Sequence, residues 1–191
     1  MYVIFDPCCC LCAKSFLAQA LSLVKQGNDH LNRNSGESTA DHLSYAANYF
    51  FSALRLILDL NVDPDNYAKI LHKLMNVESD MSFNEDLSIE ENNDHLKRAS
   101  DLGQVALAAA QKTQNSNAKG FIRLDHVFIE AHVLELNPKR ATTEEVRNEA
   151  RELSLRITRI FQGLENHESL KTREMGNYVK YWQNRLFLLS K

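Results

Sequence analysis

Residues 38–66 read STADHLSYAANYFFSALRLILDLNVDPDN. The apolar residues of this stretch recur with the i, i+3, i+4, i+7 spacing of one helix face, and further apolar residues widen that face beyond a single stripe. The members of the stripe are Leu43, Ala46, Ala47, Phe50, Ala53, Leu54, Ile57 and Leu58. Ser38 or Thr39 can begin the helix, and Asp63-Pro64 is a typical start for the next one. A helix with such a wide apolar surface is expected inside a bundle.

The same periodicity recurs along the remainder of the 191-residue chain. It predicts about seven helices, which begin near residues 11, 38, 64, 88, 120, 142 and 169. Six Gly and three Pro supply little of the turn chemistry that hairpins need. We therefore predict an all-α, single-domain helical bundle over residues 11–191, with the helices at 38–60 and 120–136 inside. The tract QNSNAKG at 114–120 marks a possible sub-boundary.

The charges are divided unevenly between the two halves of the chain. Residues 1–95 contain 14 acidic and 6 basic side chains, whereas residues 96–191 contain 11 and 16, giving the net charge of −3. Such a division can present faces of opposite sign to different partners, or it can be a set of solvated helix surfaces. Glutamates dilute the arginines of the predicted helix after residue 142, so a nucleic-acid partner is not expected.

All four cysteines lie in one cluster, Cys8, Cys9, Cys10 and Cys12. A secreted disulfide framework distributes its cysteines through the fold, so this distribution predicts a reducing, cytoplasmic compartment. We predict that residues 1–10 form a cysteine-rich tail. Acylation of the four thiols is an alternative that would bring the chain to a membrane, and metal binding is a second, although the C-x2-C spacing of structural zinc sites is missing.

No cofactor fingerprint, metal-ligand set or catalytic triad can be read from the sequence, and we expect no cofactor. His126 and Glu130 lie one helical turn apart, with Asp125 and His132 nearby. Carboxylate-bridged metal bundles require two Glu-x-x-His pairs, which this chain lacks, so interior or boundary histidines are the expected interpretation.

The last predicted helix is unusually rich in large apolar side chains, and these are the candidate partner-binding residues. They are Tyr178, Tyr181, Trp182, Leu186 and Phe187, with Arg147 and Arg151 added from the preceding helix. Aromatic side chains carry a large share of binding energy at protein interfaces. We predict a non-enzymatic protein–protein interaction module, an adaptor or structural subunit of a larger assembly, with protein partners or a second copy of itself. The alternative is that the whole aromatic set packs onto the bundle.

Two resemblances to known families bear on the packing. Residues 20–66 resemble a tetratricopeptide-like helix pair, in which Gly27 and Ala46 would occupy the helix crossing. Tyr45-Ala46, Ala53-Leu54 and NVDPDNYAKILHKLM at 61–75 are similar to HEPN-type helical domains. The second resemblance implies, as an alternative function, a ribonuclease or toxin-type protein or the helical partner of a nucleotidyltransferase. The Arg and His of HEPN nucleases are not found at the resembling positions, so the resemblance implies a form without catalysis.

Overall fold

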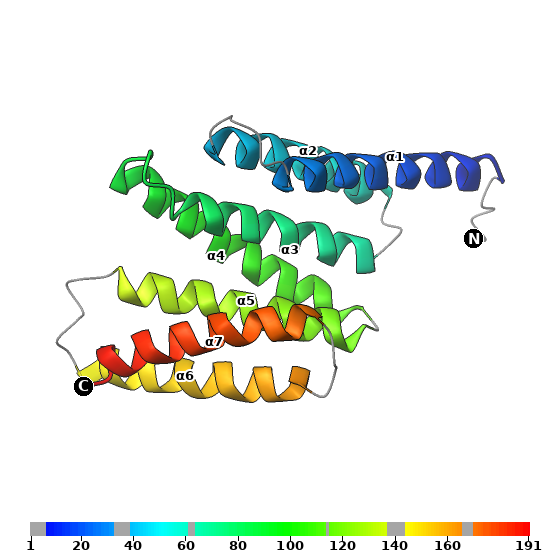
Figure 1. The fold of residues 1–191 in the computed structure, drawn as a ribbon. Helices are drawn as coiled ribbons and strands as arrows, with labels where there is room; N and C mark the ends of the chain where they lie inside the picture. The colour runs from blue at the N-terminus through cyan, green and yellow to red at the C-terminus, as the bar shows by residue number, and fades with distance from the viewer. Residues whose placement is uncertain (1–6, 33–38, 61–63, 114, 137–143, 166–169) are drawn as a thin grey trace. The chain divides into compact units, whose positions relative to one another are not determined.

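The computed structural model describes residues 7–32, 39–60, 64–113, 115–136, 144–165 and 170–191. These residues form seven α-helices and contain no strand, which confirms the all-α prediction (Figure 1). The helices are α1 (Pro7–Leu31), α2 (Thr39–Leu60), α3 (Pro64–Met81), α4 (Ile89–Gln111), α5 (Ser116–Glu135), α6 (Glu144–Glu165) and α7 (Leu170–Leu189).

The first helix begins earlier than the sequence predicts. Pro7 occupies its first position, where the fixed φ of proline is favourable and its missing N–H costs nothing. The backbone of Cys8, Cys9, Cys10 and Cys12 is therefore helical, and the helix begins four positions before the start expected near residue 11. Residues 1–6 of the predicted tail lie outside the described residues. The side chains of these cysteines lie outside the described residues. Helix α5 also begins earlier than expected, because the Asn115 side chain accepts a hydrogen bond from the Ala118 N–H.

Helix α4, expected to start near residue 88, begins with a capping box formed by Ser88 and Glu91. The Ser88 N–H donates to Glu91 Oε2 over 2.9 Å, and the Glu91 N–H donates to Ser88 Oγ over 3.2 Å. These two reciprocal bonds satisfy donors that the helix itself leaves unpaired. Hydrogen bonds from the Ser88 side chain and backbone also lower the pKa of the Glu91 carboxyl. The cap expected at Asp63 and the helix start expected near residue 142 fall outside the described residues.

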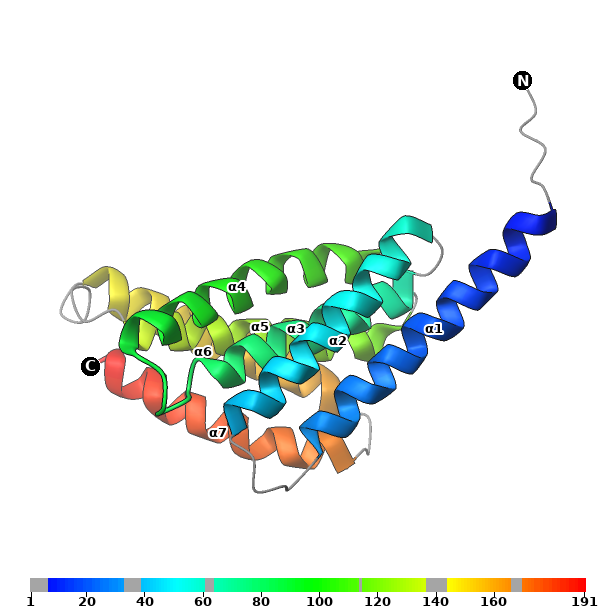
Figure 2. The same cartoon turned by 90° about the horizontal axis from the view of Figure 1, so that it is seen from above.

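The chain divides into two compact units, Met1–Thr113 and Gln114–Lys191. The division coincides with the start of the tract at 114–120 that the sequence marks as a sub-boundary, and the prediction of a single domain stays a prediction. In the first unit each helix packs mainly on its neighbours in sequence: α1 on α2, α2 on α3 and α3 on α4. Figure 2 shows α1 and α2 running side by side.

Small residues permit the close helix contacts of the first unit. A Cβ added to Gly27 on α1 would lie 2.6 Å from Cε1 of Phe50, whose side chain on α2 is fully buried. Helix α4 buries Ala99, Gly103 and Ala106 on one face. The fully buried Phe50 and Ala53 confirm that the apolar stripe of residues 38–66 forms the core side of α2.

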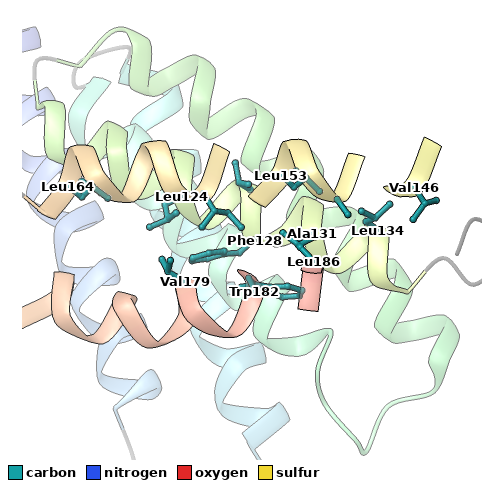
Figure 3. Close-up of a cluster of buried hydrophobic side chains, with 13 residues drawn as sticks. Leu124, Phe128, Ala131, Leu134, Val146, Leu153, Leu164, Val179, Trp182 and Leu186 are labelled. Carbon is teal, nitrogen blue, oxygen red and sulfur yellow. The ribbon is translucent and has the colours of Figure 1, made fainter. Parts of the chain in front are cut away.

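The second unit packs α5, α6 and α7 around one hydrophobic cluster (Figure 3). Its members are Leu124, Val127, Phe128, Ala131, Leu134, Val146, Ala150, Leu153, Ile157, Leu164, Val179, Trp182 and Leu186. Helix α5 contacts both α6 and α7 and contributes Leu124, Phe128 and Leu134 to this cluster. The interior position expected for residues 120–136 stays a prediction. In the part of the chain that the structure describes, no helix is long and apolar enough to cross a membrane.

Candidate functional site

Helix α7 separates its apolar side chains between a buried side and an exposed side. Trp182 and Leu186 are only 4% and 1% exposed and belong to the core of the second unit. Both are among the predicted partner-binding residues, and the structure places their side chains in the core of their own unit, where they are not exposed to a partner. Figure 3 shows that the side chains of Trp182 and Phe128 point into the space between the helices of this unit.

The other aromatic candidates of α7 are exposed. Tyr178 is 63% exposed, Tyr181 48% and Phe187 60%, and Leu188, which the sequence analysis did not single out, is 61% exposed. These four residues fall within eleven positions of one helix, and no other helix carries as many large exposed hydrophobic side chains among the described residues. We name Tyr178, Tyr181, Phe187 and Leu188 the α7 outer face; Tyr178, Tyr181 and Leu188 share one side of the helix, and Phe187 flanks that side.

Contacts at the base of the α7 outer face hold it in place. The Tyr181 ring stands edge-on to the buried Trp182 ring at 5.3 Å, and the Tyr178 ring lies 6.4 Å from that of Phe128 on α5. Arg185 of α7 forms an ion pair with Glu135 of α5. The aromatic side chains are therefore presented from a helix whose opposite side is anchored in a core, and such anchoring reduces the entropy lost on binding a partner.

The α7 outer face is also basic. Residues 175–191 contain Lys180, Arg185 and Lys191 and no acidic residue. The Lys191 ammonium lies 4.6 Å from the centre of the Phe187 ring, a cation–π arrangement. Arg185 is neutralised by Glu135, so Lys180 and Lys191 carry the net charge of the face.

The two arginines predicted from α6 have different positions. The Arg151 Nη2 donates to the backbone oxygen of Ser190 over 3.2 Å, so Arg151 lies at the end of α7. Arg147 lies 3.5 Å from Glu144 on its own helix, and no contact with α7 is described for it. The structure thus brings Arg151 next to the α7 outer face but does not show the same for Arg147.

The residues considered for a metal site do not converge. His126 Nδ1 lies 3.7 Å from Glu130 Oε1, but the other oxygen of Glu130 pairs with Arg156 Nη2 at 2.8 Å. His132 packs against the Trp182 ring at 5.9 Å, and burial lowers its pKa to about 4. Among the described residues no group of three or more His, Cys, Asp and Glu is placed to hold a metal ion.

A polar cluster of Glu78, His95 and Arg98 joins α3 to α4, and we name it the Glu78 cluster. The sequence analysis did not predict it. The carboxylate of Glu78 is nearly buried, with Oε2 2.9 Å from Arg98 Nε and 2.7 Å from His95 Nδ1. Arg98 Nη2 also lies 2.8 Å from His95 Nδ1. A single ring nitrogen cannot donate to the carboxylate and accept from the guanidinium at once. Because Glu78 Oε2 accepts from Arg98 Nε, we assign the His95 Nδ1 proton to a hydrogen bond with the same oxygen.

The sequence holds only a partial signal for this cluster. His95 and Arg98 are three positions apart and therefore share a face of α4, but Glu78 comes seventeen positions earlier on another helix. The pairing depends on how α3 and α4 pack.

Comparison of the chain with protein-family models, with curated proteins and with solved structures found no match. The resemblances to HEPN-type and tetratricopeptide-like domains therefore stay predictions.

Proposed function

We propose that this protein is a non-enzymatic protein–protein interaction module, an adaptor or a subunit of a larger assembly, and that it works in the cytoplasm. The observation that carries the proposal is the α7 outer face: Tyr178, Tyr181, Phe187 and Leu188 are exposed on a helix whose other side is fixed in a core. Exposed apolar groups that gather on one surface are a recognised mark of interaction sites. Tyrosine is among the residues most enriched at binding hot spots.

The packing of the first unit supports the same proposal. Its helices pack mainly on their neighbours in sequence. Proteins built in this way present long helix surfaces to solvent, and helical-repeat proteins use such surfaces to bind partners. The cytoplasmic assignment is supported by the confinement of all four cysteines to residues 8–12.

Site-specific photo-crosslinking of the full chain tests this function. A benzophenone amino acid at Tyr181 should give a discrete protein adduct when the chain is irradiated in the cells that naturally produce it. The control places the same amino acid at Glu149, an exposed residue of α6. Adducts that are absent at both positions, or equal at both, would remove the α7 outer face as an interaction site. An adduct of twice the chain mass would identify the partner as a second copy.

The contact between His95 and Arg98 favours a second candidate, an RNA-cleaving activity, because an imidazole and a guanidinium meet there on α4. The surrounding charge opposes it. Glu85, Asp86, Glu90, Glu91 and Asp94 are exposed in or next to the first turns of α4. Residues 1–113 contain 15 acidic against 9 basic side chains, which repels a phosphate backbone.

Incubation of the full chain with single-stranded RNA tests this candidate. A ribonuclease that uses this cluster should cleave RNA and lose the activity in His95→Gln, whereas the interaction module should leave the RNA intact. The matched control is His72→Gln, which removes a histidine of α3 outside the Glu78 cluster.

A further inference from the structure

We propose that the α7 outer face binds an acidic amphipathic helix of a partner protein. This inference rests on the proposed function and names the chemistry of the partner. Two properties of the face carry it: exposed apolar side chains with helical spacing, and basic charge without an acidic residue between positions 175 and 191.

The spacing of the exposed side chains suits a helical partner. Tyr178, Tyr181 and Leu188 are separated by three and seven positions, so they form one row along α7. The row spans about 15 Å at 1.5 Å per residue, which is the length of about three helical turns. An amphipathic helix of that length can place its own apolar row against this one, as in other helix-recognition modes.

The positive charge of the α7 outer face favours a partner that carries negative charge. Lys180 is exposed, and no acidic partner is described for it within the structure. Lys191 lies over the Phe187 ring, so Lys180 and Lys191 place positive charge beside the apolar residues. Arg151 reaches the end of α7, but its charge is shared with Glu144 at 4.0 Å. By contrast, the outer surface of α6 alternates glutamates and arginines, and Arg147 is paired with Glu144 there. Complementary charge on a partner would therefore be acidic.

The same charges argue against a symmetric pairing of two copies through this face. A two-fold contact would bring Lys180 and Lys191 of one copy against a surface that also lacks acidic residues, and like charges at an interface are unfavourable.

The charges of the second unit also argue against a nucleic-acid partner. Arg185 is neutralised by Glu135, and the second unit as a whole contains 10 acidic residues beside its 13 basic ones. An extended phosphate backbone requires a stronger field than this.

The test uses two labelled peptides and the full chain. One peptide is an amphipathic helix with leucine at i, i+3, i+4 and i+7 and glutamate on its flanks; the other is identical except that lysine replaces each glutamate. Binding is followed by fluorescence anisotropy at low and moderate salt, and the bound surface is located from amide chemical-shift changes. We expect the glutamate peptide to bind at least about tenfold more tightly than the lysine peptide, with a preference that salt weakens.

Three variants locate the site. Lys180→Glu should reduce the affinity for the glutamate peptide at least about threefold and raise that for the lysine peptide, because it reverses a charge at the face. Tyr181→Ala should reduce both affinities about tenfold, because it removes an apolar anchor. Gln162→Ala changes an exposed polar residue of α6, outside the α7 outer face, and should leave both affinities unchanged. The fluorescence of Trp182, the single tryptophan, checks that the second unit remains folded.

Several outcomes would overturn the inference. Equal binding of the two peptides, shifts located outside α7, or an unaltered affinity in Lys180→Glu would each remove the acidic-helix assignment. Binding of oligouridylate or of phosphatidylserine vesicles in place of the peptide would show another class of ligand. A dimer in sedimentation that Lys180→Glu strengthens or leaves intact would point to a second copy. If Tyr181 still crosslinks a partner while the glutamate peptide fails, the proposed function survives and only the partner chemistry is wrong.

Discussion

Gly27 on α1 lies directly against the aromatic ring of Phe50 on α2. A Cβ at position 27 would be 2.6 Å from Cε1 of that ring and 3.0 Å from its Cδ1 and Cζ. Phe50 has no exposed surface, so its ring has no solvent-filled space into which it can turn. The absence of a side chain at Gly27 is therefore a condition for the close approach of the first two helices.

Gly27→Ala should reduce the free energy of unfolding of the first unit by about 1–3 kcal/mol, the usual cost of overpacking a core. Phe50→Ala should cost about 3–5 kcal/mol through lost burial and the cavity left behind. Chemical unfolding followed by circular dichroism measures both. The controls are Phe50→Leu and the double variant Gly27→Ala with Phe50→Leu, because the smaller leucine should recover part of the loss from the added methyl group. Strictly additive losses would contradict the contact.

Two glycines of the second unit provide a matched pair. A Cβ at Gly120 on α5 would lie 2.6 Å from Cδ2 of the buried Leu164 on α6, whereas a Cβ at Gly163 would meet nothing within 4 Å. Gly120→Ala should therefore destabilise the second unit by about 1–3 kcal/mol. Gly163→Ala should stabilise it by about 0.5–1 kcal/mol, because alanine is the better helix former. Unfolding followed by Trp182 fluorescence reports on this unit, and equal effects at the two positions would refute the α5–α6 contact.

The seven helices could be predicted from the sequence because each one has its own apolar periodicity. Residues 38–58 show this most clearly: Phe50 and Ala53 belong to the apolar stripe expected inward, and both are buried. The start of α1 at Pro7 was missed because the cysteine cluster suggested a tail, although proline at the first helical position is favourable.

The candidate site could be predicted only in part. Periodicity places Tyr178, Trp182 and Leu186 on the same helix, but it does not say which side of that helix meets α5 and α6. Tyr178 is exposed and Trp182 buried, although only four positions separate them. The Glu78 cluster was missed for a related reason, because its three members come together through the packing of α3 on α4.

Glu78 should matter more to stability than the arginine that pairs with it. Its carboxylate is nearly buried and contacts both His95 and Arg98, whereas half of the Arg98 side chain is exposed. Glu78→Leu removes the acceptor for both partners and should destabilise the first unit by about 1–3 kcal/mol, the cost of leaving buried polar groups unsatisfied. Arg98→Met keeps the aliphatic stem and should cost less. Circular dichroism measures both, and a larger loss in Arg98→Met would show that the guanidinium is the central group.

His132 should make the second unit sensitive to acid. Burial lowers its pKa in the folded chain to about 4, compared with an ordinary value of 6.5. Above pH 6.5 the imidazole is neutral in both the folded and the unfolded chain and contributes no pH dependence. Between about pH 6.5 and 4 the unfolded chain binds a proton that the folded chain does not, so the free energy of unfolding falls by up to about 1.4 kcal/mol per pH unit. Below about pH 4 the loss levels off. His132→Phe keeps a ring against Trp182 and removes the titrating group, so its stability should fall less steeply over this interval. Urea unfolding followed by Trp182 fluorescence at pH 7, 6, 5 and 4 measures both proteins, and parallel pH profiles would show that His132 is not the residue responsible.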